Sequence, residues 1–113
     1  MKRFALLLLV SVLLAAPVPS SVQAPAQAQE VGGLVGEGRR LFRDTGCYGC
    51  HTVGAMGTPI APDLSHIGAK HDRAYLTSWL RDPSVQRPRA HMPKLVLTES
   101  EIQSLAAYLA SLR

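Results

Sequence analysis

Residues 47–51 read Cys47-Tyr48-Gly49-Cys50-His51, and they contain both cysteines of this 113-residue chain. Two thiols separated by two residues can add to the two vinyl groups of one haem. The histidine that follows directly can then ligate the haem iron from the same side. The motif therefore predicts a single haem c, attached covalently through Cys47 and Cys50, with His51 as an iron ligand.

Three other roles of the cysteine pair fit the surrounding sequence less well. A thioredoxin-like dithiol requires a preceding strand within a βαβ unit, and no such pattern is visible. A zinc site requires four ligands, and the candidates His66 and His71 are five positions apart, which does not place them on one helix face. A structural disulfide between Cys47 and Cys50 would leave His51 without a role.

The sequence on both sides of the motif predicts helices and no strands, because no alternating apolar run of strand length occurs. A short helix is expected over residues 38–45, before the motif. Asp72 is a suitable N-cap for a second helix, which extends through Leu80 and stops before Pro83. The fold class is therefore predicted to be all-α.

A last helix is expected to begin at Thr98, which forms a capping box with Glu101. Its apolar positions recur at helical spacing up to Leu112. The segments between helices, residues 52–68 and 83–97, are rich in glycine or proline and are expected to be loops.

The N-terminus has the pattern of a secretory signal peptide. Three residues that include two positive charges precede an apolar run over residues 4–16, which is shorter than a membrane-spanning helix requires and is followed by prolines. We expect a signal peptide over residues 1–28, or alternatively an uncleaved anchor. A flexible linker is then expected over residues 29–36 and the folded domain over residues 37–113, in the periplasm.

The charge of the exported part excludes some partners. Without Lys2 and Arg3 the chain keeps ten basic and eight acidic residues, a formal charge of +2. A nucleic-acid site would need a larger basic stripe with stacking aromatics, so no nucleic-acid partner is expected. A membrane contact is expected only through an uncleaved N-terminus or a partner enzyme. The only local concentrations of positive charge are Arg39-Arg40, Arg87 and Arg89.

From about residue 36 to residue 112 the chain resembles the class I c-type cytochromes. The matching segments, in the order of the family, are Gly38–Phe42, Cys47–His51, Ala61–Leu64, Trp79–Pro83, Pro88–Pro93 and Leu105–Leu109. The resemblance implies a small cytochrome c fold, in which three to four helices surround one covalent haem and the N- and C-terminal helices cross. Gly38 would allow the close approach at that crossing, and Phe42 would pack near Leu105 and Tyr108.

The resemblance also implies two residues that support the haem pocket. The carbonyl of Pro62 would hold the second ring nitrogen of His51, as a ligating imidazole requires. Trp79 would lie beside the pocket on the opposite side. There it either packs as core or donates its indole N–H near the ligand sulfur or a haem propionate.

Met92 is the expected sixth ligand of the iron. It lies 41 residues after His51, in a loop restrained by prolines, and this distance is sufficient for the chain to pass around the haem. Met56 is too close in sequence to reach the opposite face. His91 is the rival ligand, whereas His66 and His71 are expected to be solvated loop residues.

By resemblance, the expected function is that of a periplasmic monohaem electron carrier, which cycles its iron between Fe(II) and Fe(III). Filled axial positions leave no site for a substrate, so we expect a monomer that is not an enzyme and meets redox proteins in transient complexes. Two alternatives stay open. The chain could be a permanent subunit of a membrane respiratory or oxidising enzyme, or a gas-binding or peroxidatic haem protein.

Overall fold

A computed structural model of the chain describes residues 21–113, so residues 1–20 of the expected signal peptide lie outside the described residues. The elements follow in the order α1 (Ala26–Asp44), η1 (Cys47–Gly49), β1 (Thr52–Val53), β2 (Met56–Gly57), α2 (Ile67–Lys70), α3 (Arg73–Arg81), α4 (Pro83–Gln86) and α5 (Glu99–Ser111). The chain is mostly helical, as predicted. Within residues 21–113, no helix is long and apolar enough to span a membrane.

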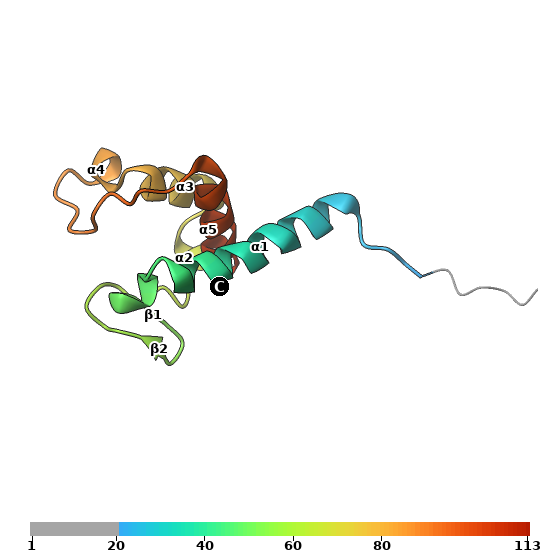
Figure 1. The fold of residues 1–113 in the computed structure, drawn as a ribbon, viewed down its shortest axis with the longest axis horizontal. Helices are drawn as coiled ribbons and strands as arrows, with labels where there is room; N and C mark the ends of the chain where they lie inside the picture. The colour runs from blue at the N-terminus through green and yellow to red at the C-terminus, as the bar shows by residue number, and fades with distance from the viewer. Residues whose placement is uncertain (1–20) are drawn as a thin grey trace, which may run out of the picture.

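The structure corrects the expected start of the first helix. α1 begins at Ala26 rather than Gly38, so residues 29–36, expected to be a flexible linker, are helical. This segment contains Gly32, Gly33 and Gly36, and each glycine costs about 1 kcal/mol in a helix interior. A helix whose C-terminal half is fixed by packing can nevertheless extend backwards, since propagation is far easier than nucleation. This extension projects away from the rest of the domain (Figure 1).

The two expected loops also contain short regular elements. β1 and β2 form an antiparallel hairpin in which Thr52 pairs with Gly57 and Val53 with Met56. α2 and α4 are single turns within or beside the same two segments. The prediction that no strand occurs was therefore wrong, because two-residue strands are too short to show an alternating pattern.

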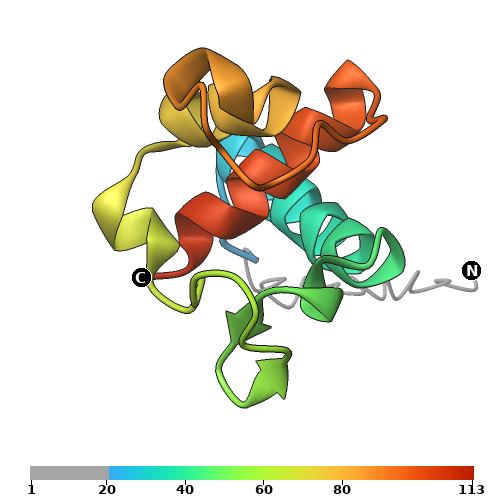
Figure 2. The same cartoon turned by 90° about the vertical axis from the view of Figure 1, so that its left-hand side faces the viewer.

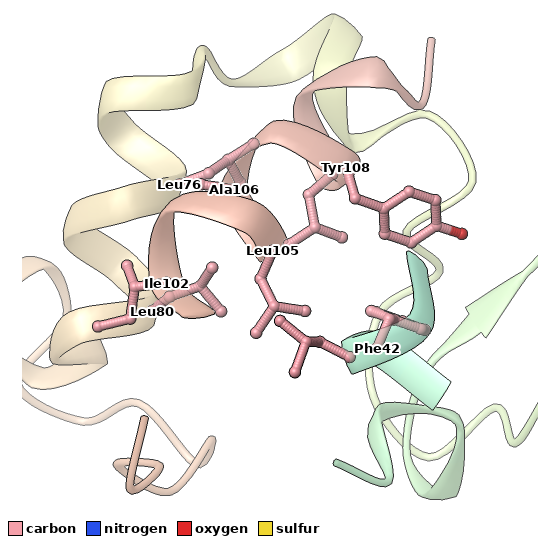
Figure 3. Packing of buried hydrophobic residues seen from close by; sticks show 9 residues of the cluster. Phe42, Leu76, Leu80, Ile102, Leu105, Ala106 and Tyr108 are labelled. Atoms are coloured by element: carbon pink, nitrogen blue, oxygen red, sulfur yellow. The ribbon is translucent and has the colours of Figure 1, made fainter. Parts of the chain in front are cut away.

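α5 is the centre of the fold, with α1 packed on one side and α3 on the other (Figure 2). Figure 3 shows Leu105 between Phe42 of α1 and the side chains that α3 contributes, Leu76 and Leu80. The rings of Phe42 and Tyr108 meet edge to face, with centroids 5.6 Å apart. The expected packing of Phe42 near Leu105 and Tyr108 is thus confirmed.

Capping residues define the N-terminal ends of α3 and α5, the two core helices that follow α1. The Asp72 carboxylate accepts a hydrogen bond from the backbone N–H of Tyr75 at 2.8 Å, at the start of α3. At the start of α5, the hydroxyl of Thr98 accepts from the N–H of Glu101, whose carboxylate accepts from the N–H of Thr98. Both predicted N-termini are therefore confirmed.

Gly38 is the point of closest approach between α1 and α5. A Cβ atom at this position would overlap the backbone carbonyl of Ser104 and the Cβ of Tyr108. The close approach implied by the resemblance is therefore present, and the two backbones could not come this near with a larger residue at position 38.

We expect Gly38→Ala to destabilise the haem-containing protein by about 1–3 kcal/mol, the usual cost of forcing an extra carbon into a packed site. The matched control is Gly36→Ala, in the same helix, where a Cβ would meet nothing within 4 Å. The control should gain up to about 1 kcal/mol from the helix propensity of alanine. Guanidinium denaturation followed by circular dichroism measures both changes. If both variants shifted the midpoint in the same direction, the helix contact at Gly38 would be wrong.

Candidate functional site

The motif Cys47–His51 lies in a tight turn directly after α1. Gly46 takes a left-handed conformation, with φ of 81°, which allows the chain to reverse into η1. The N–H groups of Cys50 and His51 both donate to the carbonyl of Cys47, at 3.2 and 2.9 Å. The ring of Tyr48 meets Phe42 edge to face, with centroids 4.8 Å apart, and this contact fixes the motif to α1.

The two cysteine side chains differ in their surroundings. Cys47 is half-buried and Cys50 is exposed. Burial raises the pKa of the Cys47 thiol, and a hydrogen bond with the hydroxyl of Thr45 opposes this shift. Cys47 therefore lies near the core, while Cys50 lies at the surface.

The imidazole of His51 is oriented by the backbone carbonyl of Pro62, which lies 2.7 Å from Nδ1. A carbonyl oxygen can only accept, so Nδ1 carries the proton. Nε2 then keeps its lone pair free for a metal. The hydrogen bond that the resemblance implied is present, and it places His51 in the tautomer that a haem ligand needs.

A small polar network holds the segment that carries Pro62. The Asp63 carboxylate accepts from the backbone N–H of Ser65 at 2.9 Å and from its hydroxyl at 2.6 Å. The same hydroxyl accepts from the N–H of Gly54, in the turn between β1 and β2, at 2.7 Å. The hydrogen bond from the Ser65 hydroxyl is the main reason why the pKa of Asp63 is lowered. This network connects the segment after Pro62 to the β-hairpin.

Sequence reasoning missed this network and one glycine beside His51. Gly57 has a φ of 104°, and a Cβ there would overlap the carbonyl of His51. The sequence did contain two local signals of these features, an Asp-x-Ser turn at residues 63–65 and the isolated Gly57. Neither shows from sequence alone that its residues contact the segment around His51.

Met92, the expected ligand on the other side, is held by Trp79. The indole Nε1–H of Trp79 donates to the Met92 sulfur at 3.2 Å. The polar role expected for Trp79 requires a hydrogen bond of this kind. Lys94, two residues after Met92, forms an ion pair with Asp82 at 3.5 Å, which ties the same loop to the end of α3. The pKa of Asp82 is lowered, mainly by the hydroxyl of Ser84.

The other candidate ligands lie in different surroundings. His91 is exposed, whereas Met92 is half-buried against the core. Met56 is 60% exposed on β2, close in sequence to the attachment motif. His66 is exposed, as expected. The prediction for His71 was wrong: it is half-buried and stacks on Tyr75, with ring centroids 3.9 Å apart, because the chain just before α3 brings both rings to one side of that helix.

The residues present fit a covalent haem. The attachment motif and the loop after α4 lie at the same end of the molecule, opposite the extension of α1 (Figure 1). Half-buried side chains pack against the core cluster from both segments and from the chain between them; they include Tyr48, Val53, Leu64, Met92 and Leu97. Such side chains suit a flat apolar ring. Residues 21–113 contain no group of three or more His, Cys, Asp or Glu side chains that could hold a metal ion.

Comparisons with known proteins agree with this arrangement. A family model described as "Cytochrome c" matches residues 35–113. Cytochrome c oxidase subunit 2 of Alkalihalophilus pseudofirmus is 32% identical over 89 residues, which cover 71% of this chain and 26% of that protein. A nitric oxide reductase subunit of Stutzerimonas stutzeri is 26% identical over 86 residues, which cover 71% of this chain and 59% of that protein. The chain thus spans about a quarter of the first relative's length and under two thirds of the second's. No solved structure gives a comparable match.

Proposed function

The chain belongs to the cytochrome c family, which binds haem c covalently, and on this premise we propose that it is an exported, periplasmic monohaem carrier of single electrons. When bound, haem c supplies a one-electron Fe(II)/Fe(III) couple. We propose that Cys47 and Cys50 form the thioether bonds and that His51 and Met92 are the axial ligands.

One observation carries the proposal. Two candidate ligating atoms, from segments far apart in the sequence, are each held by a hydrogen bond that leaves a lone pair for iron. Pro62 accepts from Nδ1 of His51, which leaves Nε2 free. Trp79 donates to the sulfur of Met92, which keeps a second lone pair. With both axial positions filled from the chain, no substrate would reach the iron, and a thioether ligand favours the reduced state.

The spectra of the purified periplasmic protein test this proposal. A c-type cytochrome with a closed iron should be low-spin in both oxidation states and should keep its haem covalently after denaturation. At neutral pH the reduced protein should bind no carbon monoxide. Ready carbon monoxide binding would support the gas-binding or peroxidatic alternative and overturn the carrier proposal.

A second candidate is a permanent subunit of a membrane oxidoreductase. The names of the relatives favour it, since they are subunits of cytochrome c oxidase and nitric oxide reductase. Fractionation of cells that produce the native chain distinguishes the two. A free carrier should be released with the periplasmic contents, whereas a subunit should stay in the membrane fraction and co-purify with further chains after detergent extraction.

We expect the rate of reaction with a redox partner to fall only weakly between low and physiological salt. Residues 29–113 carry a formal charge of only +2, and several cations are already paired: Arg40 with Glu37 and Asp44, Arg81 with Glu99. Over this range the screening length falls from about 30 Å to about 8 Å, so a focused charged patch would respond strongly. Stopped-flow kinetics at several salt concentrations measure the effect.

The matched variants for this prediction are Arg87→Gln and Arg89→Gln, two exposed positions beside the Met92 loop. Each should leave the salt dependence nearly unchanged. A steep decline in the wild type that either variant removes would show that these arginines steer the partner.

A further inference from the structure

We propose that the side chains of His71, Tyr75 and Trp79 form an electron route from Met92 to the N-terminal end of α3. This route would give the protein an electron port at the N-terminal end of α3. The inference rests on the proposed function, because it requires Met92 to ligate the iron.

The three rings form one column, which starts just before α3 and continues along one side of it. Tyr75 and Trp79 are four residues apart, so their side chains are neighbours on the helix surface. The rings of His71 and Tyr75 are 3.9 Å apart and within 9° of parallel. Those of Tyr75 and Trp79 are 6.4 Å apart and within 13° of parallel. The column ends on the Met92 sulfur, which accepts from Trp79 at 3.2 Å.

The buried side chains of α3 are Leu76 and Leu80, which belong to the core cluster. His71, Tyr75 and Trp79 are all half-buried at the side of the helix, and of these three Tyr75 packs against that cluster. Side-chain pairs at this spacing stabilise a helix only slightly, by about 0.2–0.5 kcal/mol each. Helix stability therefore accounts for a stacked pair but not for three rings in register that end on a candidate ligand atom.

The column is also held in place at both ends. Asp72 caps the first turn of α3 beside His71. Gln86 of α4 donates its side-chain amide to the backbone carbonyl of Tyr75 at 3.1 Å. The ion pair between Lys94 and Asp82 restrains the loop that carries Met92. A fixed column keeps the gaps between rings short, and electron tunnelling slows steeply as such gaps widen.

The step itself transfers one electron and nothing else. A reduced one-electron centre of a partner, docked over the outer end of α3, would lose the electron, and the ferric iron of the bound haem would gain it. No bond forms or breaks and no proton moves. The rings act as a bridge and are not themselves oxidised, so the hydroxyl of Tyr75 is not needed.

The test attaches a photoactive ruthenium polypyridine complex to the half-buried His71 of the haem-containing protein, with His66→Gln and His91→Gln removing the two exposed histidines. After a laser flash, the excited ruthenium(II) gives one electron to the ferric iron, and transient absorption measures the rate. Tyr75→Leu is expected to lower this rate by an order of magnitude. Tyr75→Phe, which keeps the ring and removes the hydroxyl, should preserve it.

A second labelling site separates the route from general effects of the variants. With the complex on His66 and with His71→Gln and His91→Gln in place, Tyr75→Leu should leave the rate unchanged. Each variant is first checked for a reversible redox couple and for the weak red sulfur-to-iron charge-transfer band that methionine ligation gives the oxidised protein. If Tyr75→Leu does not fold, Tyr75→Met replaces it. An equal rate for Tyr75→Leu and wild type from His71, with the band intact, would overturn the route and leave the carrier function standing. Absence of the sulfur-to-iron band from the spectrum of the oxidised wild type would instead overturn the proposed function.

Discussion

Met92→Ala is expected to abolish the weak red sulfur-to-iron charge-transfer band of the oxidised protein. The Met92 sulfur is held in place by the indole N–H of Trp79, so its removal should leave the sixth position of the iron open. The iron should then become high-spin or take up water. The reduced variant should bind carbon monoxide, and the reduction potential should fall because the thioether no longer favours Fe(II). Absorption spectra and redox titration measure these changes.

Two control variants distinguish Met92 from its rivals. His91→Ala should leave the band and the low-spin state intact, because the His91 side chain is exposed. Met56→Ala should be spectroscopically silent as well. Met56 is already 60% exposed on β2, so its truncation should cost far less stability than the about 2–5 kcal/mol of a buried methionine.

The opposite pattern would assign a different ligand set. If His91→Ala changed the spin state and Met92→Ala did not, the iron would have two histidine ligands. The potential would then be much lower than that of a histidine–methionine couple. The protein would work at a different point of an electron-transfer chain, and the hydrogen bond between Trp79 and Met92 would serve packing alone.

Local signals in the sequence predicted much of this molecule. The attachment motif lies within five residues, and the N-caps of α3 and α5 lie within four, so each could be interpreted without knowledge of the fold. The hydrogen bond of His51 with Pro62 and the close approach of α1 and α5 at Gly38 join distant segments. These were expected only because the chain resembles a family in which such contacts occur.

What could not be predicted depends on tertiary placement. The backward extension of α1 follows from its packing on α5, which overrides the weak propensity of its glycines. The hydrogen bonds among Asp63, Ser65 and Gly54 require the hairpin to lie against the segment after Pro62. His71 was expected to be solvated because no pattern over a few residues shows that the chain before α3 turns its ring onto Tyr75.

Loss of both thioethers is expected to unfold the domain. The structure buries ten hydrophobic residues within residues 21–113, and two of them are alanines. Tyr48, Val53, Leu64 and Leu97 pack against this cluster but stay partly exposed. A domain of about 85 residues with so small a core usually needs a further element such as a metal or cofactor to be stable. Covalent haem supplies the apolar surface that these side chains would cover, and its binding energy is then folding energy.

The variant Cys47→Ser with Cys50→Ser tests this dependence on the exported chain. Circular dichroism should show most of the helical signal lost and no cooperative thermal transition. Cys50→Ser alone is the matched control, because one thioether through Cys47 still retains the haem, and this variant should stay folded with a lower midpoint. Native helical content and a cooperative transition in the double variant without haem would contradict the expectation. The contacts of α5 with Phe42, Leu76 and Leu80 would then be sufficient to hold the fold. Haem binding would not be required for folding.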